Sequence, residues 1–200
     1  MKEVFRIFAY LKNNTNSELV FDPTENSFNK GADFPRKDWA YSIFNCDGAD
    51  LMEILPPNMP KPRGKRMTMR VYVDADHAGD VLTCRSRSRF FVFLNNAPIY
   101  WSSKKQGSTE ISTYASELVA MKEACEFVRG LRYKIRMMGI LVEEPTFIYG
   151  DNQYVMCNTS DPGSTLKKKS NAMHSTSVMK RALEMSGGLL ISIRTSTKQI

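Results

Sequence analysis

The stretch VYVDADHAGD, residues 71–80, has the pattern of a buried strand that ends in carboxylates. Its first three residues are β-branched or aromatic, which favours a strand. Three acids, Asp74, Asp76 and Asp80, then follow within seven residues. Because a carboxylate at the end of a buried strand is costly unless it has a partner, the stretch predicts that groups from elsewhere in the chain lie against these acids.

The segments around this stretch predict a mixed α/β sheet flanked by helices. We expect strands over residues 68–75, 89–95, 98–103 and 146–152. A long helix precedes the last of them, with Ser108 or Thr109 as candidate cap and Gly130 as candidate end or kink. Its apolar stripe consists of Tyr114, Leu118, Met121, Cys125 and Val128. With a short helix from Asn152, the order is β-β-β-α-β-α.

Three carboxylates should converge in such a fold. If the first and fourth strands are parallel neighbours, Asp74 and Asp151 project at the same edge of the sheet. Glu117 lies beside the apolar stripe of the long helix, where a carboxylate is unusual without an electropositive partner. Hard oxygen ligands of this kind select Mg²⁺ or Mn²⁺, and a two-metal site would activate a water for phosphodiester hydrolysis.

Each acid also has an ordinary structural interpretation. Asp74 and Asp76 are candidates for turn or helix capping, and Asp151 is a candidate N-cap of the helix that follows it. Glu117 is a candidate surface residue that pairs with a lysine; the lysines in question are Lys104, Lys105 and Lys122.

Composition and charge are consistent with a polyanionic partner, most often nucleic acid, and equally with basic faces that are simply solvated. The formal net charge is +7, and basic residues cluster in KPRGKRMTMR (61–70), CRSRSRF (84–90), RGLRYKIRM (129–137) and LKKKS (166–170). No apolar run approaches the roughly 20 residues of a membrane span. The widely spaced cysteines lack zinc-site spacing and predict reduced thiols in an intracellular, not secreted, protein.

Several motifs, in order, resemble the ribonuclease H domain of copia-type LTR-retrotransposon polyproteins. They are YVDADHAGD, FLNNAPIYWSSKKQ, ASELVAMKEA, LRYKIRMMGI and YGDNQ, and they cover about residues 67–171. FRIFAYLKNNTNSELVFD resembles the end of the preceding reverse-transcriptase region. We therefore expect a reverse-transcriptase remnant at 1–22, a poorly ordered linker or insertion at 23–66, the ribonuclease H-like domain at 67–171, and a departing tail at 172–200.

The resemblance implies an active site of four carboxylates that binds two Mg²⁺. Asp74, Glu117 and Asp151 match three of them, while Asp76 and Asp80 are expected to shape the loop and His77 to pack. The implied partners are an RNA–DNA hybrid and the reverse-transcriptase portion of the same polyprotein, in a cytoplasmic virus-like particle or the nucleus. Candidate nucleic-acid contacts are Arg85, Arg87, Lys104, Lys105, Gln106, Asn152, Gln153, Lys167, Lys168 and Lys169.

The chain departs from this family in three places. Arg89 stands where the family often has glycine, and Tyr154 stands where a small serine is usual. The tail lacks the terminal Ala-Asp that supplies the fourth carboxylate, since Glu184 is the one acid after Asp161. Codons for the tail, read from their third bases, permit AFHF, DEW, RTAYIN and TNEHQAD, which resemble the family's ending. We therefore hypothesise that one base was lost near the Met173 codon.

The sequence thus predicts an ancestral activity, metal-dependent hydrolysis of the RNA strand of RNA–DNA hybrids, which is impaired in this chain. A non-catalytic nucleic-acid-binding remnant of the same fold is the alternative. An integrase-like or resolvase-like member of the wider fold class fits the motifs less well.

Overall fold

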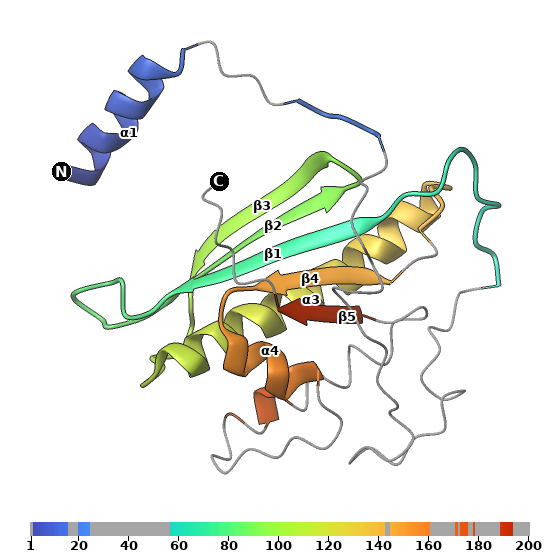
Figure 1. The fold of residues 1–200 in the computed structure, drawn as a ribbon. Coiled ribbons are helices and arrows are strands. Elements are labelled where there is room, and N and C mark those ends of the chain that lie inside the picture. Colours follow the sequence, from blue (N-terminus) through green and yellow to red (C-terminus); the bar gives the residue numbers. More distant parts are fainter. Residues whose placement is uncertain are drawn as a thin grey trace.

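A computed structural model of the chain describes residues 2–15, 20–24, 57–142, 145–160, 171, 173–175, 178 and 189–193. Its centre is a five-stranded sheet in the order β3-β2-β1-β4-β5, with the long helix α3 lying across one face (Figure 1). The strands are β1 (Met69–Asp76), β2 (Arg87–Leu94), β3 (Ala97–Lys105), β4 (Thr146–Gly150) and β5 (Leu189–Ile193). The helices within the described residues include α1 (Lys2–Asn13), α3 (Thr113–Met137) and α4 (Gln153–Ser160).

The pairing of the strands makes the sheet mixed. β1 pairs antiparallel with β2, and β2 pairs antiparallel with β3, so these three strands form a meander. On its other side β1 pairs parallel with β4, which in turn pairs parallel with β5. The predicted mixed α/β class and the predicted order of the first four strands and their two helices are therefore confirmed. β5 lies in the tail, within the apolar run GGLLISIR.

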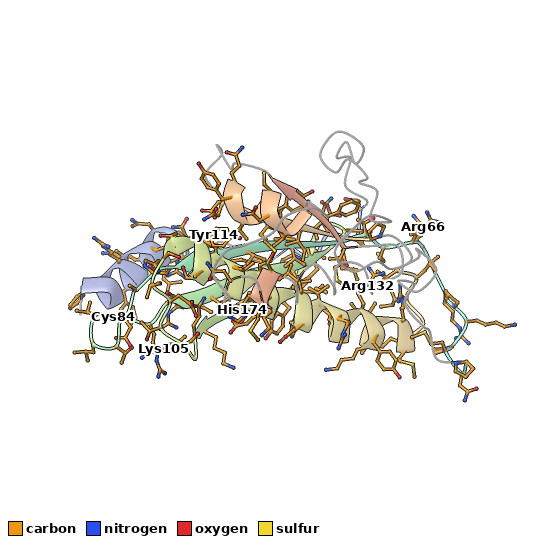
Figure 2. The ribbon with its side chains drawn as sticks, turned by 90° about the horizontal axis from the view of Figure 1, so that it is seen from below. Arg66, Cys84, Lys105, Tyr114, Arg132 and His174 are labelled. Carbon is orange, nitrogen blue, oxygen red and sulfur yellow. The ribbon has the colours of Figure 1, made fainter. Side chains whose placement is uncertain are left out.

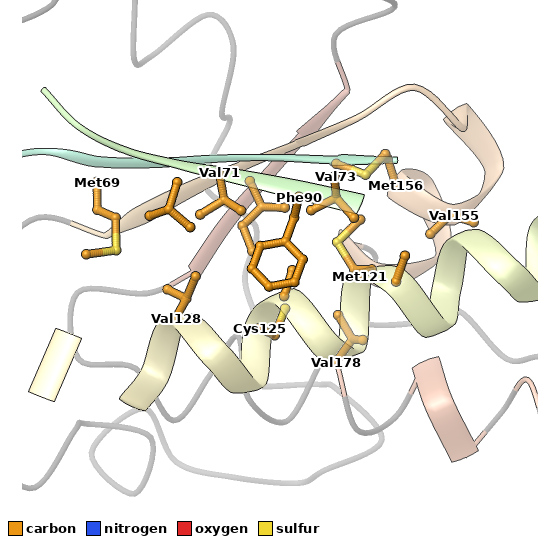
Figure 3. Close-up of a cluster of buried hydrophobic side chains, with 14 of the residues drawn as sticks. Met69, Val71, Val73, Phe90, Met121, Cys125, Val128, Val155, Met156 and Val178 are labelled. Carbon is orange, nitrogen blue, oxygen red and sulfur yellow. The ribbon is translucent and has the colours of Figure 1, made fainter. Parts of the chain in front are cut away.

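The core lies between the sheet and α3 (Figure 3). On the helix, the predicted stripe is buried, with Leu118, Met121, Cys125 and Val128 each exposed by 2% or less, while Tyr114 packs at its edge. From the sheet, alternate residues of β1 and β2 point toward this stripe; they include Val71, Val73, Phe90 and Val92. Burial of each large apolar side chain contributes roughly 1.5–3 kcal/mol, so this layer fixes the distance between β1 and α3.

The ends of α3 differ from the predicted ones. The Ser112 hydroxyl accepts a hydrogen bond from the backbone N–H of Ala115 at 3.2 Å, so the prediction of Ser108 or Thr109 as cap is wrong. The Ser108 hydroxyl donates instead to the Glu110 carboxylate. Gly130 neither ends nor breaks the helix, which continues to Met137, because an exposed glycine costs only about 1 kcal/mol of helix propensity.

Buried arginine hydrogen bonds join the C-terminal half of α3 to the chain before β4. Arg132 is fully buried, and its guanidinium donates to the Thr146 hydroxyl at 3.0 Å. Arg136 donates to the carbonyl oxygen of Val142 at 2.7 Å. Arg132 lies toward one end of the molecule and Lys105 toward the other (Figure 2). These bonds hold the start of β4 against the helix, far from the end of the sheet where the acids lie.

The face of the sheet opposite α3 carries one aromatic residue on each of β3, β2, β1 and β4 at a single register. Trp101 of β3 pairs with Phe91 of β2, Phe91 pairs with Tyr72 of β1, and Tyr72 pairs with Tyr149 of β4. The rings of Tyr72 and Tyr149 stack with centroids 4.9 Å apart. Phe91 and Trp101 are 50% and 58% exposed.

The N-terminal segment is helical, as its spacing predicts. α1 exposes the side chains of Phe5, Phe8 and Leu11. Further along, the Asn95 side chain at the β2–β3 turn donates to the Pro23 carbonyl oxygen at 2.9 Å. Most of the predicted linker at 23–66 and most of the predicted tail at 172–200 lie outside the described residues. Among the residues that the structure describes, no helix is both long and apolar enough to cross a membrane.

Candidate active site

The parallel pairing of β1 with β4 brings two acids to one edge of the sheet. In the register of these strands, Val73 is opposite Gly150, so Asp74 and Asp151 follow at the next position. β4 ends at Gly150 rather than at 152, because the chain turns there into α4. Asp151 therefore lies just beyond the strand, and both carboxylates are exposed.

Glu117 approaches the same point from α3. Because Ser112 caps the helix and Leu118 is packed in the core, the position of Glu117 in the second turn is fixed. One carboxylate oxygen from each of Asp74, Glu117 and Asp151 lies within 4.8 Å of the other two. Glu117 is buried and only 6% exposed. The structure thus brings together the three acids that the sequence singled out.

The surroundings of Glu117 disfavour its charge. Burial, and after it the negative charges of Asp151 and Asp74, together raise its pKa to about 8, although a hydrogen bond from the Ala75 backbone offsets part of the shift. In the absence of a cation, the cluster therefore holds a proton at neutral pH. A divalent cation at this place would supply the positive charge that the three groups lack.

The fit of this cluster to Mg²⁺ or Mn²⁺ follows from its donor set. Three carboxylates supply hard oxygen ligands on one side, and the exposure of Asp74 and Asp151 leaves the other side open to water. Mg²⁺ keeps several waters and needs only one or two carboxylates from the protein. The donors present therefore suit one or two such ions.

Helix capping and pairing with a lysine, the ordinary structural roles considered for Asp151 and Glu117, are not what these two acids do. Asn152, not Asp151, caps α4, because its side-chain oxygen accepts from the backbone N–H groups of Tyr154 and Val155. In the described part of the chain, the lysine Lys105 pairs with Asp80. Lysine pairing does not explain Glu117, since its carboxylate is buried.

The other two acids of the opening stretch serve the β1–β2 connection. Asp80 accepts hydrogen bonds from the Thr83 hydroxyl at 2.7 Å and from the Leu82 backbone at 3.2 Å, and it pairs with Lys105. These bonds, that with Lys105 foremost, hold the pKa of Asp80 well below its usual range. Asp76, the last residue of β1, pairs with Arg89 at 2.9 Å.

His77 follows Asp76 and is partly buried. Its Nδ1 lies 3.5 Å from the Ser86 hydroxyl, which also accepts from the backbone N–H of Ala78 at 3.1 Å. The histidine thus contributes to the same connection.

Four of the candidate nucleic-acid contacts gather where β2 begins and β3 ends. Arg87 pairs with Lys105 in the sheet, Lys104 is the next residue along, and Arg85 precedes the strand; all four side chains are exposed. Arg85, Arg87 and Lys105 line a hollow of about 460 Å³ together with Gly79, Asp80, Val81 and Ser86. Within the described residues, neither Arg85 nor Arg87 forms an ion pair, so both charges are available to a polyanion.

The remaining candidates lie in different environments. Gln106 is 1% exposed, and its amide donates to the Ser88 hydroxyl at 3.0 Å and to the Ser116 carbonyl at 2.9 Å. It joins β2 to α3, so we withdraw it from the proposed contact surface. Gln153 is exposed, whereas Asn152 is partly buried and caps α4. Lys167, Lys168 and Lys169 lie outside the described residues.

Sequence reasoning missed two features of the site. Arg89 faces Asp74 across the sheet, with the nearest guanidinium nitrogen 3.5 Å from the carboxylate. Gly150 precedes Asp151, and a Cβ added there would lie 2.9 Å from the sulfur of Met156. The departure at Arg89 was visible as a residue type, but its partner depends on strand register.

A comparison with solved structures decides the fold. A ribonuclease H1 called LC11-RNase H1, solved in complex with an RNA/DNA hybrid, superposes with a TM-score of 0.51. The superposition covers 64% of this chain and 86% of that one, at 12% sequence identity. The chain has the ribonuclease H fold. At this identity the likeness concerns the fold alone.

Comparison with curated proteins finds relatives that match only part of this chain. Over 90 residues it is 31% identical to the retrovirus-related Pol polyproteins from transposons RE2 and RE1 of Arabidopsis thaliana. This match covers 45% of the chain but only 6% of each relative. Over 55 residues it is 42% identical to secreted RxLR effector protein 161 of Plasmopara viticola, covering 28% of this chain and 39% of that protein. No protein-family model matches the sequence. The predicted resemblance to retrotransposon Pol polyproteins is confirmed.

Proposed function

We propose that this chain carries the ribonuclease H domain of a copia-type retrotransposon polyprotein, built to hydrolyse the RNA strand of RNA–DNA hybrids and impaired in that activity. The observation that supports this most is the cluster of Asp74, Glu117 and Asp151 on a ribonuclease H fold. The similarity to transposon Pol polyproteins supports the biological setting.

Each acid has a distinct part in this proposal. Asp74 and Asp151 are exposed and would hold the cations from the strand ends, and Glu117 would close the site from the helix. Bound Mg²⁺ or Mn²⁺ supplies activation of a water and stabilisation of the leaving oxygen. Glu117 must release its proton before it can act as a ligand, because its pKa is raised to about 8.

Basic side chains near the cluster would hold the substrate. Arg85, Arg87, Lys104 and Lys105 are exposed at one end of β2 and β3, in a chain of net charge +7. Charges of this kind bind phosphate groups without regard to sequence, and their contribution falls as salt rises. A hybrid would be recognised through its shape and its 2′-hydroxyl groups.

The proposed impairment rests on the missing fourth carboxylate. By resemblance it would come from a terminal Ala-Asp that the tail lacks, and a base lost near the Met173 codon is our account of that tail. In a two-metal site, the loss of one charged ligand costs orders of magnitude in rate. Sequencing the gene tests the account: a shifted frame that does not encode HF followed by DEW and RTAYIN rules it out.

A non-catalytic nucleic-acid-binding remnant is the second candidate. The ion pair of Arg89 with Asp74 favours this candidate, because Arg89 then occupies one of the three proposed metal ligands. In either case we propose an intracellular protein, in a cytoplasmic virus-like particle or the nucleus, that works with the reverse-transcriptase part of its polyprotein.

Cleavage of an end-labelled RNA–DNA hybrid by the full chain, with Mg²⁺ or Mn²⁺ and protein in excess, tests the proposal. We expect slow cleavage that is lost in Asp74→Asn and Glu117→Gln but kept in Glu123→Gln, a matched change on the same helix. Cleavage that survives Asp74→Asn contradicts the site. Binding without cleavage favours the remnant, and the absence of both contradicts both candidates.

A further inference from the structure

Arg89 places a positive charge against one of the three clustered acids. It lies on β2 directly opposite Asp74 on β1, with the two residues in register. One guanidinium nitrogen is 3.5 Å from the Asp74 carboxylate, and the other is 2.9 Å from the Asp76 carboxylate. The three side chains are about half exposed, with side-chain exposures of 42%, 51% and 42%.

Asp76 anchors this charge. Its bond to Arg89 is the shorter of the two, and both residues lie on paired strands whose backbone positions are fixed by the sheet. Arg89 therefore has a second carboxylate partner beside Asp74. Its charge lies at the edge of the sheet where Asp74 meets Glu117 and Asp151.

From this geometry we propose that Arg89 competes with the divalent cation for the Asp74 carboxylate. Its ion pair with Asp74 thereby weakens the binding of Mg²⁺ or Mn²⁺ at the three-carboxylate cluster. The inference deepens the proposed function and rests on it. It makes Arg89 a residue that sets metal affinity through Asp74 while touching neither the substrate nor the metal.

The expected size of the effect follows from Coulomb's law. A unit charge a few ångströms from a divalent ion, in a half-exposed setting, changes the binding constant on the order of tenfold. Arg87 provides a matched control, because it lies two residues away on the same strand, and it forms no ion pair within the described residues. Removing either arginine lowers the net charge by one, but only Arg89 contacts Asp74.

The test is a titration of the full chain with Mn²⁺ in the absence of nucleic acid, with free Mn²⁺ measured by electron paramagnetic resonance. We expect Arg89→Gln to bind Mn²⁺ about tenfold more tightly than the wild type, Arg89→Lys to stay close to the wild type, and Arg87→Gln to change the affinity less than about twofold.

The outcomes separate the inference from the function on which it rests. If the wild type binds Mn²⁺ and Asp151→Asn weakens that binding, the metal site stands. Equal affinities for the wild type and Arg89→Gln then overturn the role of Arg89 alone. Equal gains in Arg89→Gln and Arg87→Gln also overturn it, because they show an effect of net charge. If no variant binds Mn²⁺ at millimolar concentration, the proposed metal site fails together with the inference.

Discussion

Replacing Glu117 by glutamine should stabilise the metal-free protein at alkaline pH. The folded protein raises the pKa of Glu117 from 4.5 to about 8, first through burial and then through the charges of Asp151 and Asp74. The folded state therefore binds a proton that the unfolded state releases between these two values. Stability falls as pH rises from about 4.5 to about 8 and changes no further above that range through this group.

The size of this loss can be worked from the shift. At about 1.4 kcal/mol per pKa unit, the full shift corresponds to at most about 5 kcal/mol. Because Asp74 and Asp151 are exposed and their repulsion of Glu117 is screened by solvent, we expect about 2 kcal/mol. Glutamine keeps the shape of the side chain but cannot ionise, so Glu117→Gln should not show the loss.

The assay is urea unfolding in EDTA at pH 5 and pH 8.5 for the wild type, Glu117→Gln and Glu123→Gln. Between these pH values, the wild type should lose about 2 kcal/mol more of its unfolding free energy than Glu117→Gln does. Glu123→Gln, a change on the same helix outside the cluster, should follow the wild type. Equal pH dependence in the wild type and Glu117→Gln would refute the reasoning, because it would mean that the cluster does not hold the proton.

Three further predictions concern the supports of the site. Gly150→Val should lower hybrid cleavage by more than tenfold with a loss of roughly 1–3 kcal/mol in thermal unfolding, because its side chain would push against Met156 and displace the turn before Asp151. Arg132→Ala should cost roughly 3 kcal/mol in urea unfolding, since it leaves buried hydrogen-bond acceptors unpaired; a loss below 1 kcal/mol would contradict its role. Arg85→Gln with Arg87→Gln should reduce the slope of log binding constant against log salt by about 2 in a filter-binding assay, and an unchanged slope would remove both from the contact surface.

The sequence determined the elements and the type of chemistry. The apolar stripe from Leu118 to Val128 and the β-branched and aromatic residues of 71–73 are local patterns, and each forms the helix or strand that it predicts. The choice of Asp74, Glu117 and Asp151 also needed no coordinates, since acids at the ends of buried segments are rare enough to stand out. Local patterns were less reliable at boundaries, as Ser112 and Gly130 show, because the ends of a helix depend on which of its turns pack against the core.

Only the tertiary structure decided how the acids are surrounded. The parallel register of β1 and β4 places Asp74 and Asp151 side by side, and the burial of Glu117 raises its pKa; both depend on contacts between segments far apart in the chain. The sequence does not show that Arg89 contacts Asp74, because that contact depends on the antiparallel register of β1 and β2. Interactions between exposed charges are largely screened beyond about 10 Å, so the residue types establish which groups are available, and the packing of the sheet on α3 establishes which of them interact.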